Sequence, residues 1–389
     1  MTAFTFTTTR TIINEPGSAR RLAAICEEQG ARSVMLVTDP GIINVGLLED
    51  VLPAFKESGI QLTLFKDVEA DPADSTVTDA ANQARAAKAD YVVGFGGGSS
   101  MDVAKLVALL AHSECKQPLS DMYGVGNARG KRLPLLQVPT TAGTGSEVTP
   151  IAIVTTGATT KAGVVSPVLQ PDIALLDAEL TKGLPAHVTA ATGIDAMVHA
   201  IEAYTSVHKK NPVSDMLAKE ALRLLSSNLM AAVNEGHNLE ARSNMLLGAL
   251  YAGQAFANAP VAAVHALAYP LGGHFHIPHG LSNSLVLPHV MRFNAANDTA
   301  AAQYAELAPY IMGLDAPEGS PAQITDALIT WLEQRIKETG LPMTLRECDI
   351  PEDAIPMLAS EAMLQQRLLI NNPREVSEAD ALAIYTAAY

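Results

Sequence analysis

The sequence predicts two domains, an α/β N-terminal domain and an all-α C-terminal domain. In the first half of the chain, short apolar runs that end in turn residues alternate with segments of helical spacing, which is the rhythm of parallel βαβ units. From about residue 185 onward, almost every apolar stretch is long and helix-periodic. We therefore expect the domains to cover residues 1–184 and 185–389.

Each strand expected in the first half is short, apolar and bounded by turn residues. The run 33–38 stops at Asp39-Pro40-Gly41, and the run 91–95 stops at consecutive glycines. On these grounds we expect strands at 33–38, 59–65, 91–95, 135–138, 151–155 and 173–176, and helices at 76–87 and 101–111.

The second half is expected to be helical throughout. Its clearest segments are 190–205, 212–233 and 240–257, and the stretch 320–389 has helical spacing with turns marked by proline. The most apolar long stretch, 245–273, is interrupted by polar residues and a proline, which indicates buried helices rather than a membrane span.

The charge and cysteine content narrow the range of partners. A formal net charge of -15 repels phosphate backbones and anionic membranes, so we expect neither nucleic acid nor membrane as a partner. Cys26, Cys115 and Cys348 are far apart and odd in number, which argues against a disulfide framework or a CxxC metal site. With no signal-peptide pattern at the N-terminus, we expect a cytoplasmic protein.

A glycine-rich turn, residues 94–102, falls where an expected strand meets an expected helix. Glycines there allow the backbone to approach a phosphate closely, and the free amides at the start of a helix attract anions. Gly94 and Gly96 fit the GxGxxG dinucleotide spacing, but the third position is Ser99. The segment predicts a phosphate-binding turn; a glycine turn without a ligand is the alternative.

A second small-residue turn, residues 139–147, follows another expected strand. It offers four hydroxyls and two glycines for a ribose or pyrophosphate, and it lacks the lysine of a nucleotide-hydrolysing P-loop. Asp39, at the end of the first clear strand, is placed to bind ribose hydroxyls and to repel a 2′-phosphate, which favours NAD over NADP. The alternative for Asp39 is an ordinary turn residue before Pro40.

Four residues of the second half have the chemistry of metal ligands. Asp195 and His199 are spaced i and i+4 in an apolar helical segment, so their side chains share one face. His265 lies in a second apolar helical segment, and His279 in a loop that leads into the next helix. Three imidazoles and a carboxylate suit iron and zinc alike. The alternative is a set of buried structural histidines that never converge.

These motifs together resemble the iron-containing (group III) alcohol dehydrogenase family over essentially the full length. The resemblance rests on GGGSSMDVAK at 96–105, PTTAGTGSE at 139–147, GIDAMVHAIEA at 193–203, the segment 265–280 and Asn372-Pro373-Arg374.

The resemblance implies a dehydroquinate synthase-like architecture, in which a nucleotide-binding α/β domain and a helical domain enclose the active site. It implies Asp195, His199, His265 and His279 as ligands of Fe(II), with Zn(II) as the alternative, and Phe256 as a residue lining the substrate pocket. The cofactor NAD is implied to lie against Gly96, Gly97, Gly98, Ser99, Asp102, Thr140, Thr141, Thr144, Lys161 and Asp39.

One position departs from the family pattern. The family usually has a second histidine four residues after its third ligand, and this chain has Tyr269 there. A phenol with a pKa of about 10 is a poorer proton shuttle near neutral pH than an imidazole. Tyr269 therefore leaves the substrate open while the metal ligands are intact.

The predicted function is metal-assisted hydride transfer between a small primary alcohol or aldehyde and NAD, in a homodimer or larger homo-oligomer. The nearest alternatives are a hydroxyacid (4-hydroxybutyrate-type) dehydrogenase or transhydrogenase, a zinc-dependent polyol enzyme, and a maleylacetate-type reductase. A dehydroquinate synthase-like lyase would need a basic cluster around 265–279, which the sequence lacks. An assembly protein without activity would not be expected to retain all four ligands.

Overall fold

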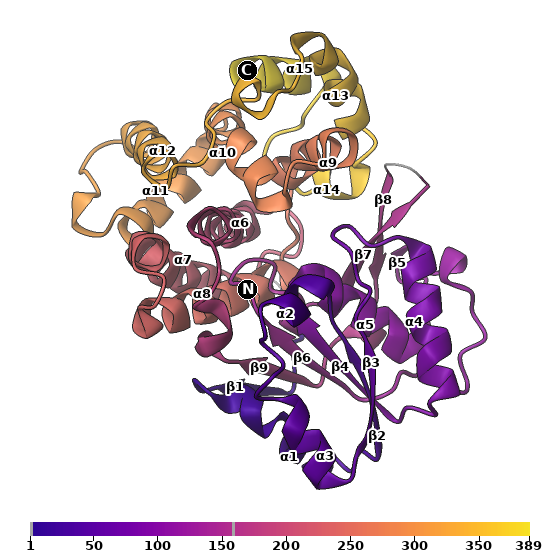
Figure 1. The fold of residues 1–389 in the computed structure, drawn as a ribbon. Coiled ribbons are helices and arrows are strands. Elements are labelled where there is room, and N and C mark those ends of the chain that lie inside the picture. Colours follow the sequence, from indigo (N-terminus) through magenta and orange to yellow (C-terminus); the bar gives the residue numbers. More distant parts are fainter. Residues whose placement is uncertain (1–2, 158–159) are drawn as a thin grey trace. The chain divides into compact units, whose positions relative to one another are not determined.

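The computed structural model describes residues 3–157 and 160–389 of the chain. These residues form two compact units, one of Thr8–Gly183 and the other of Leu184–Tyr389 with the N-terminal residues up to Thr7. The first unit is α/β and the second is helical, so the predicted fold class is confirmed (Figure 1).

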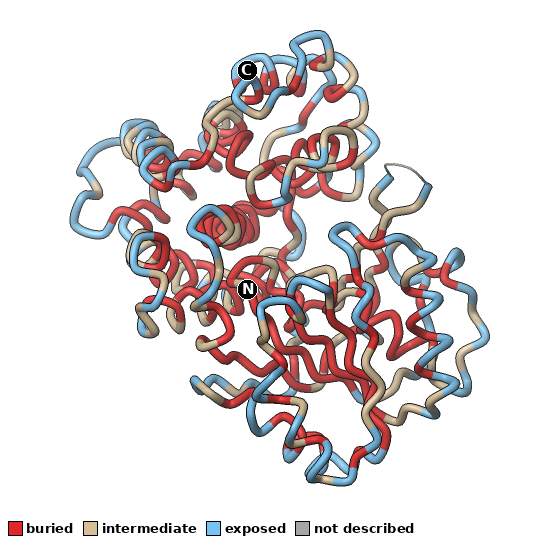
Figure 2. Tube along the Cα trace, in the orientation of Figure 1, coloured by how far each residue is buried: buried red, intermediate tan, exposed pale blue. Residues whose placement is uncertain are grey.

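A six-stranded parallel sheet forms the centre of the α/β unit, with strand order β1-β9-β6-β4-β2-β3. Central strands such as β2 and β4 are buried along their whole length, as expected for a parallel sheet covered on both faces (Figure 2). The strands are β1 (Thr11–Asn14), β2 (Ser33–Val37), β3 (Gln61–Phe65), β4 (Tyr91–Gly96), β6 (Leu135–Pro139) and β9 (Ile173–Leu176).

Alternate residues of these strands pack into two separate cores. Val34 and Leu36 of β2 lie in a core with apolar residues of α1 (Leu22–Glu28) and α3 (Leu52–Ser58). Met35 and Val37 lie in the other core, with α4 (Asp74–Ala86) and α5 (Gly98–Leu110). The short helix α2 (Pro40–Asn44) begins directly after β2.

The strand expected at 151–155 does not extend the parallel sheet. It forms β7 (Ile151–Thr156), which pairs antiparallel with β8 (Thr160–Val165), and β8 pairs in turn with β5 (Gly124–Val125) in a separate three-stranded sheet. The expectation of βαβ connectivity was wrong here. Strands so close in sequence pair as a hairpin, because parallel pairing needs a long crossover connection.

The helical unit is built from long helices whose buried faces pack on one another (Figures 1 and 2). No helix among residues 3–157 and 160–389 is long and apolar enough to cross a membrane. The helices are α6 (Ala186–Thr205), α7 (Pro212–Asn234), α8 (Leu239–Asn258), α9 (Ala263–Phe275), α10 (His279–Ala295), α11 (Asp298–Met312), α12 (Pro321–Glu338), α13 (Ile355–Ala362), α14 (Gln366–Leu369) and α15 (Glu378–Ala387).

Candidate functional site

Three helices bring four side chains together in the helical unit. Asp195 and His199 come from one face of α6, His265 from the first turn of α9, and His279 is the first residue of α10. One ligating atom from each of the four lies within 4.8 Å of the others. The Oδ1 atom of Asp195 is 3.9 Å from Nε2 of His265 and 3.7 Å from Nε2 of His279. Bonds of about 2.0–2.2 Å to one ion would place its ligand atoms at comparable separations.

Burial and charge distinguish this cluster from a surface group. Asp195, His199 and His265 are buried, whereas the side chain of His279 is 42% exposed. Burial alone would raise the pKa of Asp195, but electrostatic interactions with the three neighbouring histidines and the hydrogen bond from Asn283 outweigh it, so the pKa is lowered. The exposed histidine leaves one side of the cluster accessible to a small molecule.

The donor set fits a divalent transition metal. Imidazole nitrogens together with one carboxylate are ligands of iron and zinc. Asn283 of α10 supports the convergence, because its Nδ2 atom lies 2.5 Å from Oδ1 of Asp195 and 3.3 Å from Nε2 of both His265 and His279. The four residues predicted from the sequence are therefore adjacent, and their role as metal ligands stays a prediction.

Close packing of α10 against α6 sets the position of His279. A Cβ atom at Gly280 would overlap the carbonyl group of Ala191 in α6, 2.7 Å from its carbon atom, and would lie 3.3 Å from Cβ of Asp195. Only glycine fits this approach between two helix backbones. Gly280, the residue after His279, thus determines how near α10 comes to Asp195 of α6.

Two aromatic residues singled out from the sequence border the cluster. Phe256 of α8 stacks on the ring of His199, with centroids 4.3 Å apart and an interplanar angle of 18°. The ring of Tyr269, one turn after His265 on α9, is tilted against His279 at a centroid distance of 5.9 Å. Both therefore lie beside histidines of the cluster.

Two polar residues beside the cluster were missed in the sequence analysis. Glu202 contacts His265, and Asn283 contacts Asp195. The signal was available as helical spacing, since Glu202 is seven residues after Asp195 and Asn283 is four residues after His279. What the spacing did not reveal was which partner each side chain meets.

In the α/β unit, the glycine turn connects β4 to α5 as the sequence predicted. Gly96 has φ of 151°, and a Cβ atom at Gly98 would lie 2.8 Å from Cγ2 of Thr144. The second turn is bound to the first, because the backbone N–H of Thr140 donates to the carbonyl of Gly96 at 3.0 Å. Partly exposed residues line the two turns: Gly97, Gly98, Ser99, Thr141 and Thr144.

Asp39 lies beside the same turn. Its Oδ1 atom accepts the N–H of Ile42 at 3.0 Å and caps α2, and its Oδ2 atom accepts from the hydroxyl of Ser100 at 3.0 Å. A Cβ atom at Gly96 would be 3.0 Å from that same Oδ2. The structure therefore places the carboxylate at the glycine turn and also gives it a capping role.

Asp102 and Lys161, also predicted to bind the cofactor, have protein partners in the structure. Asp102 accepts from the hydroxyl of Ser146 at 2.6 Å, the N–H of Ile153 at 2.9 Å and the buried ammonium of Lys105 at 3.3 Å. Lys161 of β8 forms an ion pair with Asp71. These bonds explain Asp102 as a link between α5 and the second turn, and contact of either residue with a cofactor stays a prediction.

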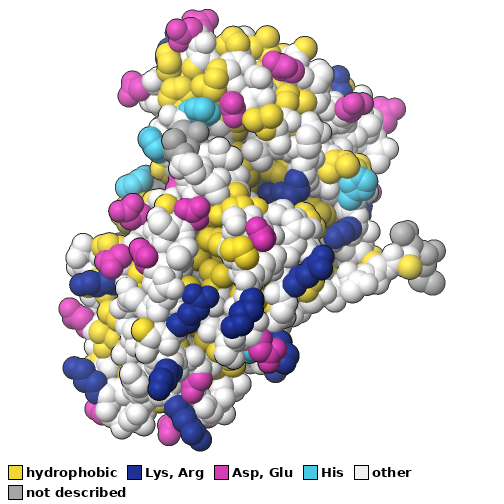
Figure 3. All heavy atoms as spheres, turned by 90° about the vertical axis from the view of Figure 1, so that its right-hand side faces the viewer, with side chains coloured by type: hydrophobic (Ala, Val, Ile, Leu, Met, Phe, Trp, Pro, Cys, Tyr) yellow, Lys and Arg dark blue, Asp and Glu magenta, His cyan; other side chains and the backbone are white. Residues whose placement is uncertain are grey.

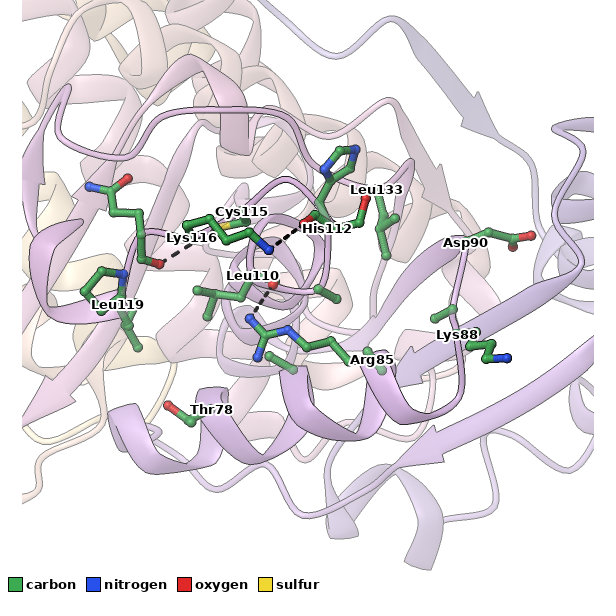
Figure 4. A pocket seen from close by; sticks show the side chains of 17 residues that line it. Thr78, Arg85, Lys88, Asp90, Leu110, His112, Cys115, Lys116, Leu119 and Leu133 are labelled. Atoms are coloured by element: carbon green, nitrogen blue, oxygen red, sulfur yellow. Dashed lines mark hydrogen bonds between the residues drawn. The ribbon is translucent and has the colours of Figure 1, made fainter.

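A groove elsewhere on the α/β unit is a weaker candidate site. Lys and Arg side chains gather on the face of this unit that Figure 3 shows, and the groove is lined by Arg85 of α4 and by Lys116 (Figure 4). Arg85 donates to the carbonyl of Leu110 at 2.6 Å and Lys116 to that of Ser113 at 3.1 Å. These cations satisfy carbonyls at and after the end of α5, which accounts for them without a ligand.

Comparison with known proteins identifies relatives of both units. The family profile described as "Iron-containing alcohol dehydrogenase" matches residues 9–178. The profile described as "Fe-containing alcohol dehydrogenase family, C-terminal" matches residues 189–389.

Individual relatives match the chain over nearly its whole length. The chain is 40% identical to a long-chain-alcohol dehydrogenase of Geobacillus thermodenitrificans, covering 96% of this chain and 93% of the relative. It is 38% identical to a 1,3-propanediol dehydrogenase of Klebsiella pneumoniae, covering 94% and 93%.

Solved structures of related proteins have the same fold. A 1,3-propanediol oxidoreductase superposes with a TM-score of 0.92 at 35% identity, with both chains covered fully. A sulfoacetaldehyde reductase of Bifidobacterium kashiwanohense, solved in complex with NAD+, superposes with a TM-score of 0.86 at 31% identity, covering 100% of this chain and 99% of the other.

Proposed function

Since this chain belongs to the iron-containing alcohol dehydrogenase family, we propose that Asp195, His199, His265 and His279 bind one divalent metal ion and form its reaction centre. The chain is an oxidoreductase that acts on CH–OH groups. The observation that carries the proposal is the convergence of four ligand atoms from three helices within 4.8 Å. Fe(II) is the expected ion, as the family name implies, and Zn(II) suits the same donors.

The side chains around the centre have separate tasks. The carboxylate and the three imidazoles would hold a divalent cation, which would provide a Lewis acid for the oxygen of an alcohol or aldehyde. The exposed side of His279 gives that oxygen access, and the ring of Phe256, stacked on His199, offers an apolar wall for the carbon chain of the substrate. The phenol of Tyr269 lies beside His279, where it can donate a hydrogen bond to a substrate oxygen.

The cofactor is proposed to be NAD, held at the two turns of the α/β unit. The start of α5 offers N–H groups to a pyrophosphate, and Thr141 and Thr144 offer hydroxyls beside it. The carboxylate of Asp39 would repel the 2′-phosphate of NADP. The NAD+ complex of the related sulfoacetaldehyde reductase supports this assignment.

The substrates are proposed to be small primary alcohols and their aldehydes. The relatives named above act on long-chain alcohols or on 1,3-propanediol, as their names state, and these names favour alcohol oxidation over the hydroxyacid and maleylacetate alternatives. We further propose that the protein forms a homodimer or larger homo-oligomer and that it does not bind nucleic acid. The three free cysteines suit a reducing compartment such as the cytoplasm.

Metal reconstitution tests the proposal directly. Protein stripped with a chelator is assayed for NADH oxidation with a panel of short aldehydes after addition of Fe(II), Zn(II) or no metal. Activity should return with Fe(II). His265→Ala should lower kcat by about 10³-fold or more, because metal assistance contributes several kcal/mol to such reactions.

His274→Ala is the matched control for His265→Ala. His274 is on the same helix, but its Nε2 atom lies 3.9 Å from Oε2 of Glu361, and it is not one of the four converging residues. This variant should keep activity within about twofold of the unchanged protein. Full activity of the stripped protein without metal, or of His265→Ala, would refute the metal assignment.

A further inference from the structure

Glu202 is a buried acid that lies on the same face of α6 as two of the proposed ligands. Asp195, His199 and Glu202 are spaced i, i+4 and i+7, so they share one stripe of the helix. The side chain of Glu202 is only 4% exposed. A carboxylate buried to this degree needs hydrogen-bond partners for both oxygens.

Both partners of Glu202 come from the first turn of α9. Its Oε2 atom lies 2.6 Å from Nδ1 of His265, and its Oε1 atom accepts the backbone N–H of Val264 at 2.7 Å. The N-cap of α9 is Ala262, which has no side chain able to cap. Glu202 therefore caps this helix from a distance and contacts the imidazole ring of His265 with the same group.

The contact determines which nitrogen of His265 faces the cluster. A carboxylate only accepts hydrogen bonds, so Nδ1 of His265 must carry the proton that lies between them. The Nε2 atom then keeps its lone pair, and it is this atom that lies 3.9 Å from Oδ1 of Asp195. An imidazole bonded to a carboxylate in this way is fixed in orientation and is a more basic ligand.

We propose that Glu202 is the positioning residue of the metal centre, which holds His265 in the Nδ1-protonated form and orders the first turn of α9 around it. The proposal rests on the metal centre proposed above and adds a residue that does not bind the ion itself. It also explains why this helix begins with alanine and still presents a ligand within its first turn.

Glu202→Gln is the informative substitution, because a glutamine cannot serve both partners. Its single carbonyl oxygen can accept from Val264 or from Nδ1 of His265, and its NH₂ group then faces the remaining donor. If the NH₂ group faces His265, Nδ1 must become an acceptor and the proton moves to Nε2, which can then no longer bind a metal. In either orientation the change removes the charge and leaves one hydrogen bond unmade with little change in volume, and with the NH₂ group toward His265 it also reverses the tautomer.

The measurement is metal affinity, obtained by competition between the protein and a chelator for Co(II) or Zn(II). Glu202→Gln should raise the metal Kd by about 10- to 100-fold, as removal of such outer partners of histidine ligands commonly does. Glu306→Gln is the control. It removes another carboxylate of the helical unit, one that accepts the hydroxyl of Tyr204, and it should leave the metal Kd within about twofold.

The outcomes separate the two proposals. If the unchanged protein binds no metal, both the centre and the role of Glu202 are refuted. If the unchanged protein binds metal and Glu202→Gln binds it equally well, only the role of Glu202 is refuted. A loss of thermal stability in Glu202→Gln with unchanged metal Kd would show a helix cap alone, and would likewise refute the positioning role.

A second measurement uses the unchanged protein and so does not depend on whether a variant of Glu202 folds. In metal-free protein with ¹⁵N-labelled histidine, where no ion imposes the tautomer, long-range ¹⁵N–¹H spectra report which ring nitrogen carries the proton, and His265→Ala assigns the signal. We expect a proton on Nδ1 of His265 and none on Nε2. A proton on Nε2 instead would overturn the proposal.

Discussion

Asp39 illustrates how one side chain can serve both local structure and selectivity. Its carboxylate caps α2 through the N–H of Ile42 and accepts from Ser100 beside the glycine turn. From the sequence, a ribose-binding role and an ordinary turn role were alternatives; the structure shows the capping role, and ribose binding stays a prediction. The Oδ1 atom accepts the capping hydrogen bond, whereas the negative charge of the carboxylate would act on any group bound at the glycine turn.

Asp39→Asn should separate these roles. Asparagine caps helices as well as aspartate does, so the free energy of unfolding should change by less than about 0.5 kcal/mol. Loss of the negative charge should raise the ratio of kcat/KM for NADPH to that for NADH by about tenfold or more, since removing about 1.4 kcal/mol of repulsion is sufficient. Steady-state kinetics with both cofactors measure the ratio.

Asp90→Asn is the matched control. Asp90 also accepts backbone N–H groups, those of Arg32 and Ser33. It directly precedes β4, however, so it lies at the opposite end of that strand from Gly96. Its substitution should leave the cofactor ratio unchanged. An unchanged ratio in Asp39→Asn as well would show that this carboxylate takes no part in cofactor choice.

Among the elements, the contact between α6 and α10 beside the proposed metal centre has a steric requirement for glycine. The two helices bring Asp195, His199 and His279 together, and at Gly280 the backbone of α10 lies against that of Ala191 in α6. The sequence showed Gly280 only as part of a motif. The requirement for glycine at this position is steric, because any Cβ atom there would overlap the carbonyl group of Ala191.

Gly280→Ala should therefore force α10 away from α6. Overpacking of this kind costs about 1–3 kcal/mol of unfolding free energy. Displacement of His279 should also weaken metal binding by about tenfold or more, because a ligand that no longer reaches the ion loses most of its bond. Denaturant unfolding in the presence of chelator, followed by metal titration, measures the two effects separately.

Gly272→Ala provides the comparison within a neighbouring helix. A Cβ atom at Gly272 of α9 would meet nothing nearer than the carbonyl oxygen of Ile277 at 3.5 Å, which is ordinary contact. Alanine also favours helix over glycine by roughly 1 kcal/mol. This variant should be as stable as the unchanged protein or more so; metal affinity equal to that of the unchanged protein in Gly280→Ala would contradict the steric argument.

Over the whole molecule, the two candidate sites belong to different units. The proposed metal ligands all lie in Leu184–Tyr389, and the two cofactor turns lie in Thr8–Gly183. Each unit has its own buried core, so each ligand is expected to stabilise the unit that binds it. This division allows the two binding events to be measured apart.

Hydrogen exchange should resolve the two events. Metal alone should slow exchange in α6, α9 and α10, and NAD alone should slow it at the start of α5 and in residues 139–147. At a ligand concentration 100 times Kd, the stabilisation reaches about 2.7 kcal/mol, which is roughly a hundredfold in exchange rate for groups that exchange through unfolding of that unit. Metal-induced protection confined to the α/β unit would refute the ligand assignment.

The sequence by itself determined the fold class, the rhythm of the parallel sheet, and the candidate ligands and cofactor turns. These features depend on local periodicity and on spacing within one element, such as the i and i+4 positions of Asp195 and His199, and on glycines at the end of a strand. Sequence also indicated that His279 stands at the entry to a helix, where α10 begins.

Only the tertiary structure decided which faces meet. Spacing placed Glu202 on the stripe of α6 that carries Asp195, but packing of α9 gave it His265 and Val264 as partners. Packing likewise brought Asn283 of α10 to Asp195 of α6. The physical reason is that helical or strand periodicity fixes the direction of a side chain relative to its own element, whereas its neighbours depend on close packing between elements far apart in sequence.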